Sequence, residues 1–204
     1  MRAPIRATAQ TALLVIDMVS CWDFPDAAPL LVQARKIAPA IARLAARCRV
    51  AGIPVIYAND NRGQWQSDFR TLVETALACP GGPGEITRAI APREEDYFIL
   101  KPKQSAFFGT PLELLLQHLG ARRLVLTGVS SDQCVLVTAF EARMRDMQVV
   151  VPADCVASQS VSRNRTALAQ CRDTHGIPVT PSSRLRLLQA RTEPRSRRKT
   201  TTGG

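Results

Sequence analysis

The chain has 204 residues, of which 46% are hydrophobic and 5% aromatic, and its formal net charge is +10. This length suits one domain with a substantial apolar core, and the composition excludes both a disordered and a fibrous protein. No apolar stretch approaches the roughly 20 residues that a membrane helix requires, so we expect no membrane span and no membrane partner.

Strand and helix patterns alternate along the chain. In chain order we predict a strand at 11–16, a helix at 30–50, a strand at 53–58, a helix at 71–78, an irregular Gly- and Pro-rich loop at 79–84, a strand at 97–100, a helix at 111–119, a strand at 123–127, a helix at 133–145, a strand at 149–151, a helix at 161–174 and a strand at 177–180. This alternation predicts parallel strands joined by right-handed crossovers, and so a doubly wound α/β sandwich.

The two chain ends and the cysteines bear on the extent of the folded domain and on its cellular compartment. Basic residues without apolar periodicity fill residues 191–204, so we predict a folded domain over 1–190 and a basic, disordered tail over 191–204. The tail is interpreted as a solubility segment, with weak contact to an anionic surface as the alternative. The apolar run near the N-terminus is too short for a signal peptide, and the six cysteines lack CxxC pairing, which favours reduced thiols in the cytoplasm.

Several polar residues fall where predicted strands end. Asp17, Asn59 and Lys101 follow three of the strands, and residues 128–134 follow a fourth. Sites in open α/β sheets form beyond the carboxyl ends of the strands, so these residues make a candidate site.

The candidate site carries the groups of a cysteine hydrolase. Cys134 stands at a predicted helix start, where free backbone N–H groups and the helix dipole favour a thiolate. Lys101 can add a positive charge, and Asp17 can accept the thiol proton and pass it to a leaving amine. Taken singly, each residue also has an ordinary explanation. Cys134 can be a small buried side chain, Lys101 a solvated lysine and Asp17 an aspartate that caps a turn.

Three segments, in order, resemble the motifs of the isochorismatase-like cysteine hydrolases. They are residues 12–18 (ALLVIDM), similar to the first strand and catalytic aspartate; residues 101–112 (KPKQSAFFGTPL), similar to the lysine segment; and residues 128–135 (GVSSDQCV), similar to the nucleophile segment. Lys101 rather than Lys103 matches the catalytic position. The resemblance spans about residues 11–187, and the three motifs together are specific.

The resemblance implies a fold and a mechanism. It implies a three-layer α/β/α sandwich with a six-stranded parallel, Rossmann-like sheet that binds no dinucleotide or other cofactor. It implies an Asp17, Lys101 and Cys134 triad acting through a covalent cysteine intermediate, and a cis peptide between Val129 and Ser130. The oxyanion hole would consist of the backbone N–H groups of Ser130 and Cys134. Family members are commonly oligomers, so we expect a homo-oligomer.

A metal site is not expected. Nicotinamidase relatives place an Asp-x-His metal motif after the second strand, whereas this chain has Arg62 where the histidine would stand. The chain has only His118 and His175, for which surface or packing roles are favoured.

The loops at the strand ends supply candidate substrate-binding residues. They are Phe24, Asn59, Arg62 and Trp65, with Arg62 able to bind a carboxylate as a bidentate donor. Alternatively, Arg62 is a solvated surface residue, and Phe24 and Trp65 cover the core or form a subunit contact.

The favoured function is cleavage of a C–N bond in a small amide or ureido substrate. True isochorismatases resemble the fold but lack the nucleophilic cysteine, so Cys134 argues against vinyl-ether hydrolysis, which is kept as an alternative. Two further alternatives are a catalytically silent scaffold or binding protein of the same fold and a nucleic-acid binder that uses the basic tail. The absence of a recognised nucleic-acid module disfavours a nucleic-acid partner.

Overall fold

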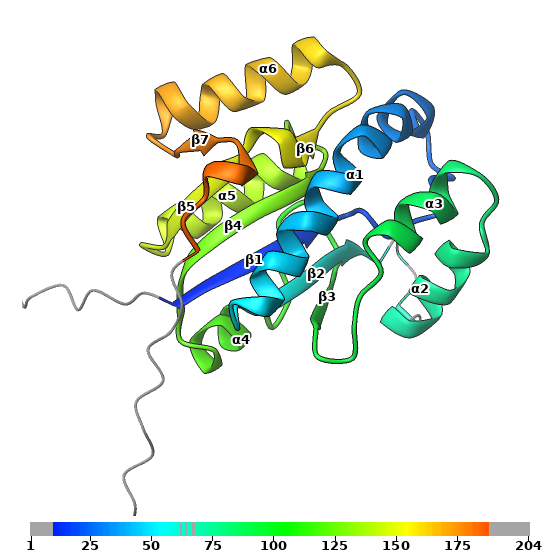
Figure 1. Cartoon of the computed structure of the whole chain (residues 1–204), viewed down its shortest axis with the longest axis horizontal. Helices are drawn as coiled ribbons and strands as arrows, with labels where there is room; N and C mark the ends of the chain where they lie inside the picture. The colour runs from blue at the N-terminus through cyan, green and yellow to red at the C-terminus, as the bar shows by residue number, and fades with distance from the viewer. Residues whose placement is uncertain (1–9, 62, 64, 67, 188–204) are drawn as a thin grey trace, which may run out of the picture.

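The computed structural model describes residues 10–61, 63, 65–66 and 68–187. Within these ranges a parallel sheet runs in the order β3-β2-β1-β4-β5-β7, and a short strand, β6, pairs with the end of β4. The strands are β1 (Gln10–Ile16), β2 (Val55–Asp60), β3 (Tyr97–Lys101), β4 (Ala121–Val129), β5 (Gln148–Pro152), β6 (Val156–Ala157) and β7 (Val179–Thr180). The predicted α/β sandwich with a parallel sheet is confirmed (Figure 1).

Helices cover both faces of the sheet (Figure 1). They are α1 (Ala27–Val50), α2 (Phe69–Ala78), α3 (Gly82–Ala89), α4 (Leu112–His118), α5 (Cys134–Met144) and α6 (Val161–Ala169), which continues as a π-helical turn at Gln170–Thr174. Short 3-10 turns stand at Ala153–Cys155 and Ser182–Arg184. No helix in the described ranges has the length and apolar character needed to cross a membrane.

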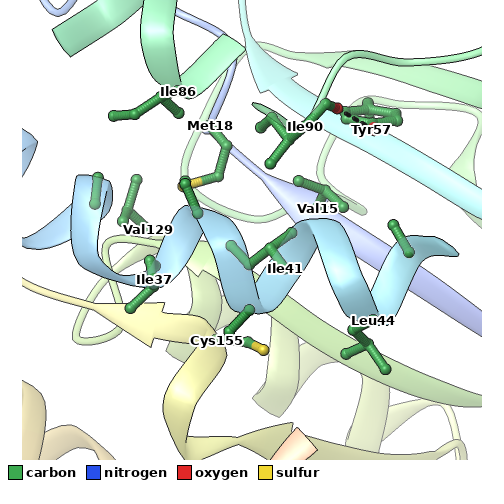
Figure 2. Packing of buried hydrophobic residues seen from close by; sticks show 14 of the residues in the cluster. Val15, Met18, Ile37, Ile41, Leu44, Tyr57, Ile86, Ile90, Val129 and Cys155 are labelled. Carbon is green, nitrogen blue, oxygen red and sulfur yellow. Dashed lines mark hydrogen bonds between the residues drawn. The ribbon is translucent and has the colours of Figure 1, made fainter. Parts of the chain in front are cut away.

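Alternating side chains of β1 divide the core into two clusters. Leu13 and Val15 pack with α1, α2 and α3 on one face, while Leu14 and Ile16 pack with α4 and α5 on the other. Figure 2 shows the first cluster, in which Ile41 of α1 and its neighbours meet the sheet. The two buried layers hold the strands rigidly, so the loops at the carboxyl ends of the strands start from fixed positions.

The structure corrects two of the predicted elements and adds a third. Residues 79–84 were expected as an irregular loop, but α3 begins at Gly82, because Pro83 suits the first turn of a helix. The last strand is only Val179–Thr180, and β6 was not predicted, because two-residue strands carry no periodicity. The predicted tail, 191–204, lies outside the described residues, and the division of the chain at residue 190 stays a prediction.

Gly128 is required where β4 passes the end of β1. Its φ is +104°, and a Cβ at this position would lie 2.0 Å from the carbonyl oxygen of Ile16. Any side chain would therefore push apart two strands: β1, which leads to Asp17, and β4, which leads to the turn at 130–133 before Cys134 (the nucleophile turn).

We expect Gly128→Ala to destabilise the protein by at least about 2 kcal/mol, because backbone strain and a backbone clash act together. Thermal unfolding measures the change. Gly176→Ala is the matched control, because its φ is +60° but nothing lies within 4 Å of the added Cβ, so it should cost only about 1 kcal/mol. Equal losses in the two variants would show that the close approach to Ile16 is not limiting.

Candidate active site

The structure brings Asp17, Lys101 and Cys134 together at the carboxyl edge of the sheet. Asp17 directly follows β1, Lys101 ends β3, and Cys134 begins α5 after β4. Asp17 and Cys134 line a cavity of about 660 Å³. Parallel strands place their carboxyl ends on one edge, which is why residues more than 100 positions apart meet here.

Lys101 is the electrostatic centre of the site. Its side chain is 0% exposed, and Nζ lies 2.9 Å from Asp17 Oδ2, 3.7 Å from Asp60 Oδ2 and 3.6 Å from Cys134 Sγ. Nζ also donates to the carbonyl oxygen of Lys103 at 3.2 Å. Burial lowers the pKa of Lys101, but Asp17 and its other anionic neighbours raise it more, so the pKa stands above its usual value and the ammonium stays charged.

Both carboxylate oxygens of Asp17 have a partner that fixes the orientation of the side chain. Oδ1 accepts from the backbone N–H of Asp60 at 2.8 Å, while Oδ2 faces Lys101. Burial raises the pKa of the Asp17 carboxyl above its usual value, although Lys101 opposes this change. A carboxylate with a raised pKa is a stronger base, which suits a group that must accept a proton.

The Cys134 thiol is largely buried and lies beside two charged side chains, Asp17 and Lys101. Burial and the Asp17 carboxylate raise its pKa to about 12, and Lys101 lowers it by less. The expectation of a thiolate stabilised by the helix start is therefore wrong: desolvation and a neighbouring negative charge outweigh the position at the start of α5. The sulfur of Cys134 accepts from Lys101 Nζ at 3.6 Å, and the neighbouring Asp17 carboxylate is positioned to take the thiol proton.

The turn between β4 and Cys134 presents backbone N–H groups. The Val129–Ser130 peptide is cis. The carbonyl oxygen of Ser130 accepts from the N–H groups of Gln133 and Val135, both at 3.1 Å. Within the described ranges, the N–H groups of Ser130 and Cys134 have no hydrogen-bond acceptor. Both residues line the cavity, and unpaired N–H groups of this kind can bind a developing oxyanion.

Two of the predicted substrate-binding residues line the cavity. Phe24 and Asn59 do so, and Asn59 Nδ2 donates to the carbonyl oxygen of Val19 at 2.7 Å, which holds the segment after β1. Trp65 is 78% exposed and does not line this cavity, so its role in substrate binding stays a prediction. Arg62 lies outside the described residues.

Sequence reasoning missed other parts of the cavity wall. Thr71 and Thr75 of α2 and Gln159 after β6 line it. A helical pattern in 71–78 was visible, but its orientation toward the site was not. Gln159 had no signal, because it follows a strand of only two residues.

A disulfide joins the cavity wall to the end of α2. Cys21, which lines the cavity, is bonded to Cys79, with a Cα–Cα distance of 5.7 Å and a sequence separation of 58. The expectation that all cysteines are reduced is wrong for this pair, since spacing along the chain does not reveal which cysteines the fold brings together. The other cysteines are free thiols, and of these only Cys134 is not fully buried.

The family model described as "Isochorismatase domain" matches residues 11–183. The chain belongs to the isochorismatase family. It is 35% identical over 178 residues to the isochorismatase family protein YaaI of Bacillus subtilis, with 87% of this chain and 97% of that protein covered. A second relative, isochorismatase of B. subtilis, is 33% identical over 154 residues, which cover 73% of this chain and 49% of that protein.

Solved structures of the family share the fold. N-carbamoylsarcosine amidase from Thermoplasma acidophilum superimposes with a TM-score of 0.67 at 26% identity, covering 86% of this chain and 98% of that one. This chain is therefore a hydrolase of the isochorismatase family, and its relatives include an amidase.

No group of three or more His, Cys, Asp or Glu side chains in the described ranges is arranged to hold a metal ion. His118 ends α4, and the ring of His175 contacts Phe140, with ring centroids 3.9 Å apart. Because Arg62 lies outside these ranges, independence from metal stays a prediction.

Proposed function

We propose that this protein hydrolyses a C–N bond of a small amide or ureido substrate through a covalent intermediate on Cys134. The observation that carries the proposal is the position of Lys101 Nζ, 2.9 Å from Asp17 and 3.6 Å from Cys134 Sγ, beside a cavity of about 660 Å³. A thiol, a base and a fixed cation within contact of one another are the parts that acyl transfer requires. The name of the amidase relative supports a C–N bond as the target.

In the first half-reaction the Cys134 sulfur attacks the substrate carbonyl carbon while its proton moves to Asp17. The carbonyl π electrons move to oxygen, and the N–H groups of Ser130 and Cys134 bind the resulting oxyanion. When the carbonyl re-forms, the C–N bond breaks and Asp17 returns the proton to the leaving nitrogen. Lys101 stays charged throughout and stabilises the sulfur and the Asp17 carboxylate.

In the second half-reaction water attacks the acyl or carbamoyl thioester. Asp17 accepts a proton from this water, the C–S bond breaks, and the proton returns to sulfur. The site is then as it began, so Cys134, Asp17 and Lys101 complete the cycle without a further reactant.

The pH dependence of kcat/KM follows from the two raised pKa values. Activity requires the Asp17 carboxylate, so it should fall as the pH drops through a pKa above the usual 3.8. It should not increase as the pH passes about 8.5, the ordinary pKa of a thiol, because Cys134 has a pKa of about 12 and stays protonated. Steady-state rates from about pH 4 to about pH 10 measure both limbs. An activity that rises with a midpoint near pH 8.5 would show that the free thiolate is the working form.

The test of the function is a screen of small amides and ureides that reads ammonia release, with Cys134→Ala as the control. Because a relative is named isochorismatase, isochorismate is included as a vinyl-ether substrate. Turnover of isochorismate that survives Cys134→Ala would replace the C–N proposal. A chain that turns over no substrate and whose Cys134 does not react with thiol reagents would be the silent scaffold.

The remaining properties are predictions of the same proposal. We expect a small-molecule substrate, a homo-oligomer, a cytoplasmic location and no nucleic-acid or membrane partner. Light scattering on the purified protein determines the assembly.

A further inference from the structure

Asp132 lies in the turn between β4 and α5, where its carboxylate accepts three side-chain hydrogen bonds and forms an ion pair. Its Oδ1 accepts from the hydroxyl of Ser130 and, at 2.6 Å, from the hydroxyl of Ser158. Its Oδ2 accepts from Arg163 Nε at 2.7 Å and forms an ion pair with Arg163 Nη2 at 2.6 Å. These bonds hold the pKa of the Asp132 carboxyl below its usual value even though burial opposes them. Asp132 is not part of the mechanism described above.

The partners of Asp132 connect the nucleophile turn to a segment that is distant in sequence. Ser158 and Arg163 follow β6, and Ser158 is fully buried. The same segment holds the turn a second time, because the N–H of Ser131 donates to the carbonyl oxygen of Ala157 at 2.7 Å. The turn is therefore fixed from its side chains and from its backbone.

These contacts hold Ser130 while leaving its N–H group unpaired within the described ranges. The hydroxyl of Ser130 is bound to Asp132, and its carbonyl oxygen accepts two N–H groups, from Gln133 and Val135. Of the polar groups of Ser130, the N–H alone has no partner within the described ranges. The hydroxyl and the carbonyl oxygen of Ser130 are thus both held, and Ser130 lines the cavity together with Cys134.

We propose that Asp132 is a positioning residue that aims the N–H of Ser130 at the oxyanion, with Ser158 and Arg163 holding its carboxylate in place. The proposal rests on the proposed function, because an oxyanion forms only if Cys134 attacks a carbonyl. A hydrogen-bond donor is effective only when it is aligned in advance, and displacement by about 1 Å can cost a hundredfold in rate.

Two reagents separate positioning of the donor from reactivity of the thiol. p-Nitrophenyl acetate acylates Cys134: a C–S bond forms through a tetrahedral oxyanion and p-nitrophenolate leaves. Iodoacetamide alkylates the same sulfur by displacing iodide, with no oxyanion. We expect Asp132→Ala to slow acylation by roughly tenfold to a hundredfold while alkylation and its pH profile stay nearly unchanged. Nitrophenolate absorbance and intact-protein mass measure the two rates.

Several variants complete the test. Asp132→Asn retains an acceptor for Ser130 but loses the charge that pairs with Arg163, so it should slow acylation by less than Asp132→Ala. Ser158→Ala removes one contact and should act in the same direction, which keeps the test valid if Asp132→Ala does not fold. Asp173→Asn is the matched control, because Asp173 pairs with Arg172 on the exposed surface, away from the cavity. It should change neither rate.

The outcomes distinguish the two proposals. Equal slowing of acylation and alkylation in Asp132→Ala would overturn the positioning role, since the thiol itself would then be displaced. Unchanged acylation in both Asp132→Ala and Ser158→Ala would overturn it as well. Acylation by the unchanged protein that persists in Cys134→Ala would instead contradict the proposed function.

Discussion

Alanine at position 134 is expected to reduce turnover by at least about four orders of magnitude, because it removes the atom that forms the covalent bond. The fold should remain, since the change deletes one sulfur from a side chain that is only partly buried at the start of α5. Ammonia release and thermal unfolding measure the two quantities on the same preparation.

Cys171→Ala is the matched control for this substitution. Cys171 is a free thiol buried in the core, so its loss should lower stability and leave activity in place. Substantial turnover by folded Cys134→Ala protein would remove Cys134 from the mechanism.

Replacing Lys101 by alanine is expected to lower kcat/KM by about three orders of magnitude or more. The fully buried ammonium lies between Asp17, Asp60 and Cys134, and nothing in an alanine replaces its charge. Since Lys101 lowers the pKa of Asp17, its removal should also move the acid limb of the pH profile to higher pH. The rate and the midpoint of this limb are measured together.

Lys103→Ala is the control for the lysine. Lys103 is exposed and contributes only its carbonyl oxygen to Lys101, so its side chain should be dispensable. A mild loss for Lys101→Ala, or an acid limb that does not move, would show that Lys101 has been given the wrong role.

The main layers of the fold were predictable because their elements are long and patterned. The helix predicted at 30–50 repeats its apolar residues at helical spacing, and the structure has α1 at Ala27–Val50. The strand predicted at 11–16 is the apolar run that becomes β1. Short elements were not predictable: β6 has two residues, and α3 begins inside a run of Gly and Pro that is typical of a loop.

In the active site, too, some residues were predictable from the sequence and other features were not. Asp17 and Lys101 could be proposed from strand ends and motif resemblance, because both are local signals. The contacts of Asp132 could not, since Ser158 and Arg163 follow it by 26 and 31 positions and meet it only through the pairing of β6 with β4. The pKa of Cys134 was mispredicted because burial and the Asp17 carboxylate depend on packing, which position at a helix start does not reveal.

The bond between Cys21 and Cys79 also makes a closed covalent ring of part of the backbone. The ring contains all of α1, β2 and α2 and spans 58 positions. Such a ring lowers the conformational entropy of the unfolded chain, which corresponds to a stabilisation of the folded state by about 4 kcal/mol at 25 °C. A protease that cuts the backbone once within this ring therefore leaves two pieces on one molecule, and they separate on a denaturing gel only after reduction.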